Sequence, residues 1–110
     1  MKEYLYVFGY ETPTQSRNNE EHGWDDEDSR AIYILASNEE SALGWGHQIA
    51  ERFFQALYED PNASWIRGGY AAWIEEQDRF TQDQLRLIPR VKEGELPDIQ
   101  EMVEQSLRDD

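Results

Sequence analysis

The sequence predicts an α+β fold: a single mixed or mainly antiparallel sheet of about five strands, one long amphipathic helix packed on it, and a short C-terminal helix. Two runs rich in aromatic and β-branched residues, 4–10 and 31–36, are typical of buried strands. Between residues 42 and 57 the apolar residues recur at helical spacing. The expected order is β-β-α-β-β-β-α, without repeat or linker, in one domain spanning residues 1–110.

The first strand has two different faces, because successive side chains of a strand point to opposite sides. Its aromatic face consists of Tyr4, Tyr6, Phe8 and Tyr10. Leu5 and Val7 lie on its aliphatic face. With apolar side chains on both sides, this strand is expected in the centre of the sheet.

The long helix is expected to start at Ser37, since Glu40 three residues later completes a capping box. Its apolar stripe is wide enough to lie on a sheet. Gly46 falls near the middle of that stripe and allows a close backbone approach, whereas Gly44 falls on the polar side. Residues 60–62, Asp-Pro-Asn, end the helix.

The second half of the chain is expected to add a hairpin, an edge strand and a helix. Residues 63–67 and 70–74 flank Gly68-Gly69 and suggest a hairpin, with a short helix as the alternative for 70–74. Residues 85–91 alternate around Pro89, which suits an edge strand. Asp98 and Glu101 resemble a capping box at the start of the terminal helix.

Composition excludes several classes of function. The chain has 24 Asp and Glu against 10 Lys and Arg, a formal net charge of −14, so direct binding to nucleic acid or to an anionic membrane is disfavoured. It has no cysteine, which removes disulfides and thiolate metal sites. No apolar run approaches the roughly 20 residues of a membrane span, and residues 1–10 make a poor signal peptide, so a cytoplasmic location is expected.

A long polar loop, residues 11–30, carries the densest charge. Its acidic residues are Glu20, Glu21, Asp25, Asp26, Glu27 and Asp28, with Trp24 among them. The spacing does not match a calcium-binding loop, and no metal ligand or cofactor site is expected. Trp24 either packs back on the domain or contacts a partner, because Trp is favoured at interface hot spots.

Two further sets of residues are candidates for function. The aromatic face (Tyr4, Tyr6, Phe8 and Tyr10) is a candidate contact surface, unless the terminal helix or a homodimer covers it. His47 and Glu51 lie one turn apart, so they are a candidate general-base or metal pair, although a boundary histidine is the simpler interpretation.

We therefore expect a non-enzymatic acidic protein-binding module, such as an inhibitor, an immunity-type protein or an adaptor, that engages a basic protein partner. Mimicry of nucleic acid is a special case of this hypothesis. One alternative is a structural homo-oligomer whose acidity reflects salt adaptation. Another is a metal-dependent enzyme that uses His22 or His47 with nearby carboxylates.

Overall fold

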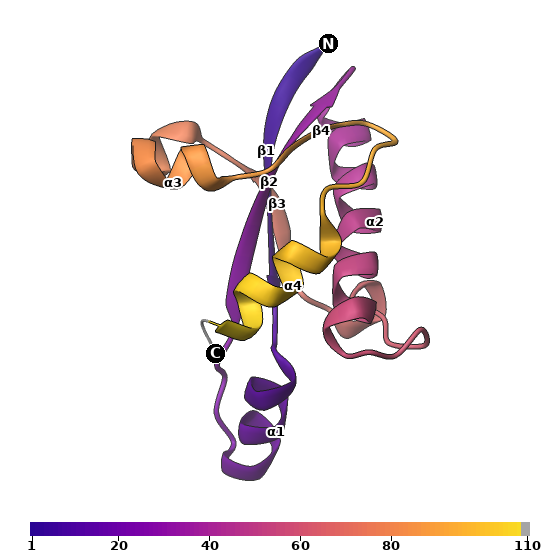
Figure 1. The fold of residues 1–110 in the computed structure, drawn as a ribbon, viewed down its shortest axis with the longest axis vertical. Helices are drawn as coiled ribbons and strands as arrows, with labels where there is room; N and C mark the ends of the chain where they lie inside the picture. Colours follow the sequence, from indigo (N-terminus) through magenta and orange to yellow (C-terminus); the bar gives the residue numbers. More distant parts are fainter. Residues whose placement is uncertain (109–110) are drawn as a thin grey trace.

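The computed structural model describes residues 1–108 and contains a four-stranded mixed sheet with helices on both faces (Figure 1). In chain order the elements are β1 (Lys2–Tyr10), α1 (Pro13–His22), β2 (Asp28–Ala36), α2 (Glu39–Leu57), the 3-10 turn η1 (Ile66–Gly68), β3 (Ala72–Glu75), the 3-10 turn η2 (Gln77–Arg79), α3 (Gln82–Leu87), β4 (Arg90–Lys92) and α4 (Ile99–Arg108). The α+β class, the long helix and the C-terminal helix are confirmed. The expected number of strands is wrong, because the sheet has four.

The strand order is β3-β1-β2-β4, which confirms that β1 is central. β1 runs antiparallel to β2 and β3, whereas β4 pairs in parallel with β2 at Tyr33–Leu35 only. In Figure 1, α2 lies on one face of the sheet and α3 on the other. No helix within residues 1–108 is long and apolar enough to cross a membrane.

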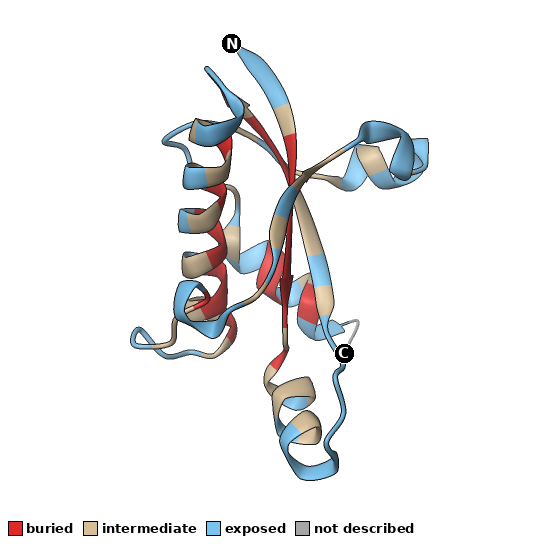
Figure 2. Ribbon diagram, turned by 180° about the vertical axis from the view of Figure 1, so that it is seen from behind, coloured by how far each residue is buried: buried red, intermediate tan, exposed pale blue. Residues whose placement is uncertain are grey.

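The core lies between the sheet and α2, where Figure 2 shows buried residues on β1, β2 and the inner side of α2. Its fully buried large side chains include Tyr6, Phe8, Ile32, Ile49 and Phe53. The rings of Phe8 and Phe53 meet edge to face, with centroids 5.5 Å apart, a favourable geometry for aromatic pairs. α4 closes one end of this core.

The start of α2 differs by one residue from the expected start. Asn38, not Ser37, is the N-cap, and its side chain accepts a hydrogen bond from the backbone N–H of Ser41 at 2.8 Å. Asparagine caps at least as well as serine, so the adjacent Asn38 displaces the predicted capping box.

The predicted hairpin around Gly68-Gly69 is wrong in its first arm. Residues 63–67 form no strand, because Trp65 turns into the core and its Nε1 donates to the carbonyl oxygen of Gly9 at 2.7 Å. Gly69 has φ of 74°, a left-handed conformation that suits glycine, and ends the turn η1. The second arm forms β3, so the strand interpretation of residues 70–74 is confirmed for Ala72–Ile74.

The edge strand expected over residues 85–91 is confirmed only at its end, as β4. Residues 82–87 form α3 instead, because Thr81 and Gln84 make a capping box that starts a helix. The terminal helix starts as expected, since the Asp98 side chain accepts from the N–H of Glu101 at 3.0 Å.

Candidate functional site

The polar stretch 11–30 is not a loop, as the sequence suggested, but a projection that contains α1. Thr12 and Gln15 form a capping box, Pro13 occupies the first turn, and Gly23 ends the helix at φ of 68°. None of the ten residues of α1 is buried, and Figure 1 shows it beyond the end of the sheet. The helix was not predicted because its apolar residues show little helical periodicity, although its capping residues are visible in the sequence.

The end of this projection, residues 20–28, is here called the acidic tip. It brings all six predicted carboxylates together: Glu20 and Glu21 in the last turn of α1, and Asp25, Asp26, Glu27 and Asp28 in the segment returning to the sheet. Five of them are exposed, and Asp28 is half-buried. The tip is therefore strongly anionic, and it lies outside the part of the molecule that packs on the hydrophobic core.

Side-chain hydrogen bonds, rather than apolar packing, hold the acidic tip in place. The Asn19 amide donates to the carbonyl of Asp26 at 2.8 Å and accepts from the N–H of Asp26 at 3.0 Å. It also donates to the Glu11 carboxylate. Gln15 donates to Asp28 at 3.1 Å. The returning segment is thus bound to α1 at Asp26 and Asp28, which limits the conformational entropy that the tip would lose on binding.

Trp24 lies on this tip with 52% of its surface exposed. Its ring stacks on the imidazole of His22, with centroids 4.4 Å apart and planes inclined by 25°. The stack orients the indole without covering it, so Trp24 does not pack back on the domain core.

The aromatic face of β1 is not a contact surface. Tyr6 and Phe8 are 0% exposed and Tyr10 is 1% exposed, because α2 and α4 cover them, whereas Tyr4 is half-buried. This is the alternative in which the chain covers the face itself. The candidate partner-binding residues therefore no longer include Tyr6, Phe8 and Tyr10.

His47 and Glu51 do not form a pair. The Nδ1 of His47 hydrogen-bonds the hydroxyl of Tyr6 at 2.8 Å, and burial lowers the pKa of His47 and raises that of Tyr6. Glu51 instead accepts hydrogen bonds from the hydroxyl of Ser64 and the N–H of Trp65, at 2.9 and 2.5 Å. Both residues hold structure, which agrees with the boundary-histidine interpretation.

Two further chemical features bear on function. Within residues 1–108, no three His, Asp or Glu side chains are grouped so that they could hold a metal ion.

Glu11 accepts a hydrogen bond from the hydroxyl of Tyr70 at 2.8 Å. The pKa of Tyr70 is raised, mainly because the side chain is buried and secondly because of its hydrogen bond to the Glu11 carboxylate. The Glu11–Tyr70 contact ties the base of the projection to the segment before β3.

A groove that the sequence did not predict runs along β2, between α4 and the segment from α3 to β4. It encloses about 560 Å³ and is lined by Ser29–Ala31, by one face of α4 and by residues 86–89. Arg30 lies in it and donates to Ser106 Oγ at 2.9 Å and to Gln105 Oε1 at 3.1 Å. The residues that line the groove come from three separate segments, so no local sequence pattern predicted it.

Comparisons of this chain with protein-family models, curated proteins and solved structures give no match.

Proposed function

We propose that this protein is a non-enzymatic binding module, of the inhibitor, immunity or adaptor kind, that engages a basic protein partner through its acidic tip. The observation that carries the proposal is Trp24, a half-exposed indole held among six carboxylates. Burying a large apolar ring in such a position against another molecule contributes favourable free energy to binding.

The charge and the indole have separate roles in this proposal. A net charge of −14 accelerates the encounter with a basic surface, and this long-range attraction weakens as salt shortens the screening length below its value of about 8 Å at physiological ionic strength. Trp24 acts only at contact, where a buried aromatic residue slows dissociation. The hydrogen bonds of Asn19 support the proposal further, because they order the tip before it binds.

A charge-matched comparison tests whether binding is located at the tip. Wild-type protein, Asp25→Asn/Asp26→Asn and Glu40→Gln/Glu104→Gln serve as baits in a lysate of the source cells, and captured proteins are quantified by mass spectrometry. Both variants remove two exposed carboxylates, but only the first removes them from the tip. We expect a basic protein to be lost with the tip variant and retained with the control.

Two results would contradict the proposal. One is equal capture by the two double variants, which indicates attraction to the overall charge rather than to the tip. The other is recovery of no basic protein at low salt, where an electrostatically assisted complex is strongest.

A further inference from the structure

The edge of the sheet beside the groove has main-chain groups without partners. β4 covers β2 only at Tyr33–Leu35, so residues 28–32 form a free edge. The N–H of Tyr33 donates to Pro89 at 2.9 Å, which shows that odd-numbered residues of β2 direct their main-chain groups away from β1. Ser29 and Ala31 therefore present N–H and C=O groups along the groove. No residue within 1–108 hydrogen-bonds to these groups.

Arg30 adds an unpaired charge to this edge. Arg30 is half-buried, and its guanidinium donates to two neutral acceptors, Ser106 and Gln105. In the described part of a chain with 24 acidic residues, no carboxylate forms an ion pair with it. An arginine that is oriented and partly desolvated, but not neutralised, matches a carboxylate supplied by a ligand.

Other charged residues also line the groove. Arg86 and Arg108 lie there together with Asp98 and Glu101. Arg86 forms an exposed ion pair with Asp83 at 3.7 Å, so its charge is already matched. Asp98 already caps α4. Of the three arginines that line the groove, Arg30 and Arg108 form no ion pair with a carboxylate within residues 1–108.

The two helices that flank the free edge, α3 and α4, leave room for one extended chain rather than for the edge of a second folded sheet. α4 lies on the α2 face of the sheet, and α3 projects from the opposite face (Figure 1). Leu87, at the end of α3, is 82% exposed and lines the groove, and Ile88 follows it. A strand added along β2 would direct one side chain towards Arg30 and its two neighbours towards Leu87 and Ile88.

From these observations we infer that the free edge of β2 binds an extended segment of another polypeptide by strand addition, with a carboxylate side chain of that segment on Arg30 and apolar side chains on either side of it. The occupant is an acidic–apolar segment and not the basic surface proposed for the tip. The two interactions are independent, because the tip acts through Trp24 and the carboxylates around it, whereas the groove acts through Arg30 and the main chain of Ser29 and Ala31.

The test uses two blocked heptapeptides, STVEVTS and STVKVTS, which are titrated into the isotope-labelled chain of 110 residues and followed by amide NMR. The Glu peptide should perturb the amides of residues 29–31 and slow the hydrogen exchange of Ala31. It should bind at least about tenfold more tightly than the Lys peptide. Overall charge alone predicts the opposite order, so tighter binding of the Lys peptide, or no shift at residues 29–31, overturns the inference.

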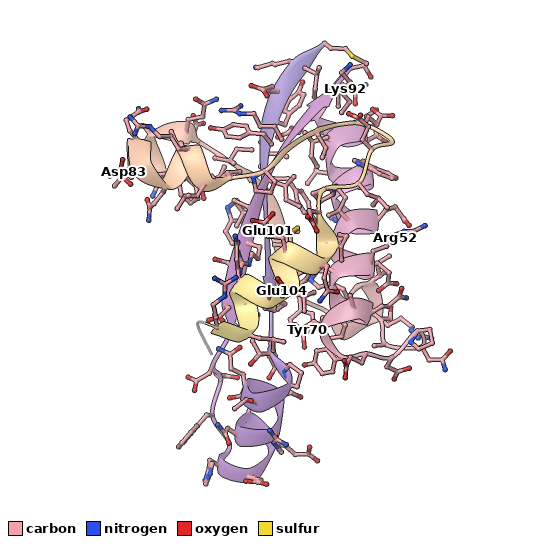
Figure 3. All side chains as sticks on the ribbon, in the orientation of Figure 1. Arg52, Tyr70, Asp83, Lys92, Glu101 and Glu104 are labelled. Carbon is pink, nitrogen blue, oxygen red and sulfur yellow. The ribbon has the colours of Figure 1, made fainter. Side chains whose placement is uncertain are left out.

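Two charge reversals locate the site. Arg108→Glu changes an exposed arginine of the groove, and Arg52→Glu makes the same change on the outer side of α2 (Figure 3). We expect the Glu peptide to bind at least about fivefold more weakly to the first variant and within twofold of wild type to the second. Equal affinities for the two variants contradict a site in the groove. Ala31→Pro removes the N–H that a bound strand would use but suits an edge position, so it should weaken binding of the Glu peptide; unchanged affinity contradicts strand addition.

Discussion

Replacing Gly46 by alanine tests the contact on which the core depends. A Cβ at this position would lie 2.5 Å from Cδ1 and Cε1 of Tyr6 and 2.6 Å from Cγ. Tyr6 cannot move towards solvent, because it is 0% exposed and its hydroxyl is bonded to His47. Gly44, two residues earlier on the same helix, has no neighbouring atom within 4 Å of the equivalent Cβ.

The two substitutions are therefore expected to have opposite signs. Alanine favours a helix over glycine by about 1 kcal/mol, a gain common to both variants. At residue 46 the crowded ring adds an overpacking cost of about 1–3 kcal/mol, which we place at or above the upper end because three ring atoms are too close. We expect Gly44→Ala to raise the free energy of unfolding by about 0.5–1 kcal/mol and Gly46→Ala to lower it by about 2 kcal/mol.

Urea denaturation followed by far-UV circular dichroism measures both variants against wild type. The corresponding change in Tm is about 4–8 °C per kcal/mol for a domain of this size. If Gly46→Ala is as stable as Gly44→Ala, then α2 does not approach β1 at Gly46 and the packing of the core described above is incorrect.

Three further substitutions test other contacts. Ser106→Ala should lower the free energy of unfolding by about 1–3 kcal/mol in the same urea assay, because Tyr10 loses its 2.9 Å hydrogen bond inside the core. For His47→Gln, the loss of stability relative to wild type should become smaller as the pH falls from about 7.5 to about 5.5. The reason is that burial lowers the pKa of His47 in the folded state. Wild type is therefore progressively destabilised by protonation as the pH falls below the unfolded pKa of histidine, about 6.5. His22→Gln is its control for the loss of one exposed imidazole. Asn19→Ala should speed amide hydrogen exchange in residues 24–28 while leaving that of β1 unchanged.

Each of these has an outcome that would count against it. Wild-type stability of Ser106→Ala means that α4 is not anchored through its hydroxyl. A parallel pH dependence of wild type and His47→Gln means that the imidazole is not shielded from protonation. Unchanged exchange in residues 24–28 of Asn19→Ala means that the tip is ordered by something other than this amide.

Strong periodicity made the fold class, β1, β2 and α2 predictable from the sequence. The aromatic face of β1 and the stripe of α2 are long enough for burial to dominate any local preference. Even the position of Gly46 against the sheet follows from the stripe, as the 2.5 Å approach of Tyr6 to its virtual Cβ shows.

The errors occur where capping or one long-range contact outweighs a short pattern. Thr12 and Thr81 start helices with little apolar character, which periodicity does not reveal. Trp65 appeared to belong to a strand, but its bond to Gly9 and the Glu51 carboxylate fold its segment into a turn. The capping boxes are local signals that apolar periodicity does not report, whereas the fold of the Trp65 segment is a tertiary effect on a stretch too short to have a strong preference of its own.

The candidate site divides in the same way. Crowding of carboxylates around Trp24 is a local feature and is visible in the sequence. The burial of Tyr6 and Phe8 depends on which face of β1 receives α2 and α4. The groove at Arg30 exists because β4 runs parallel to β2 and begins pairing with it only at Tyr33. Neither can be read from neighbouring residues.

The most direct test of the proposed function is the affinity of the captured basic partner for Trp24→Ala, measured by calorimetry beside wild type and Trp73→Ala at physiological salt. Trp73 is a suitable control because it is 41% exposed but lies on β3, away from the tip. Trp24→Ala leaves the net charge at −14, so overall electrostatic attraction is unchanged. We predict a dissociation constant raised about 30-fold for Trp24→Ala, corresponding to a hot spot of about 2 kcal/mol, and within about twofold for Trp73→Ala. Equal affinities for wild type and Trp24→Ala would contradict a binding site at the acidic tip.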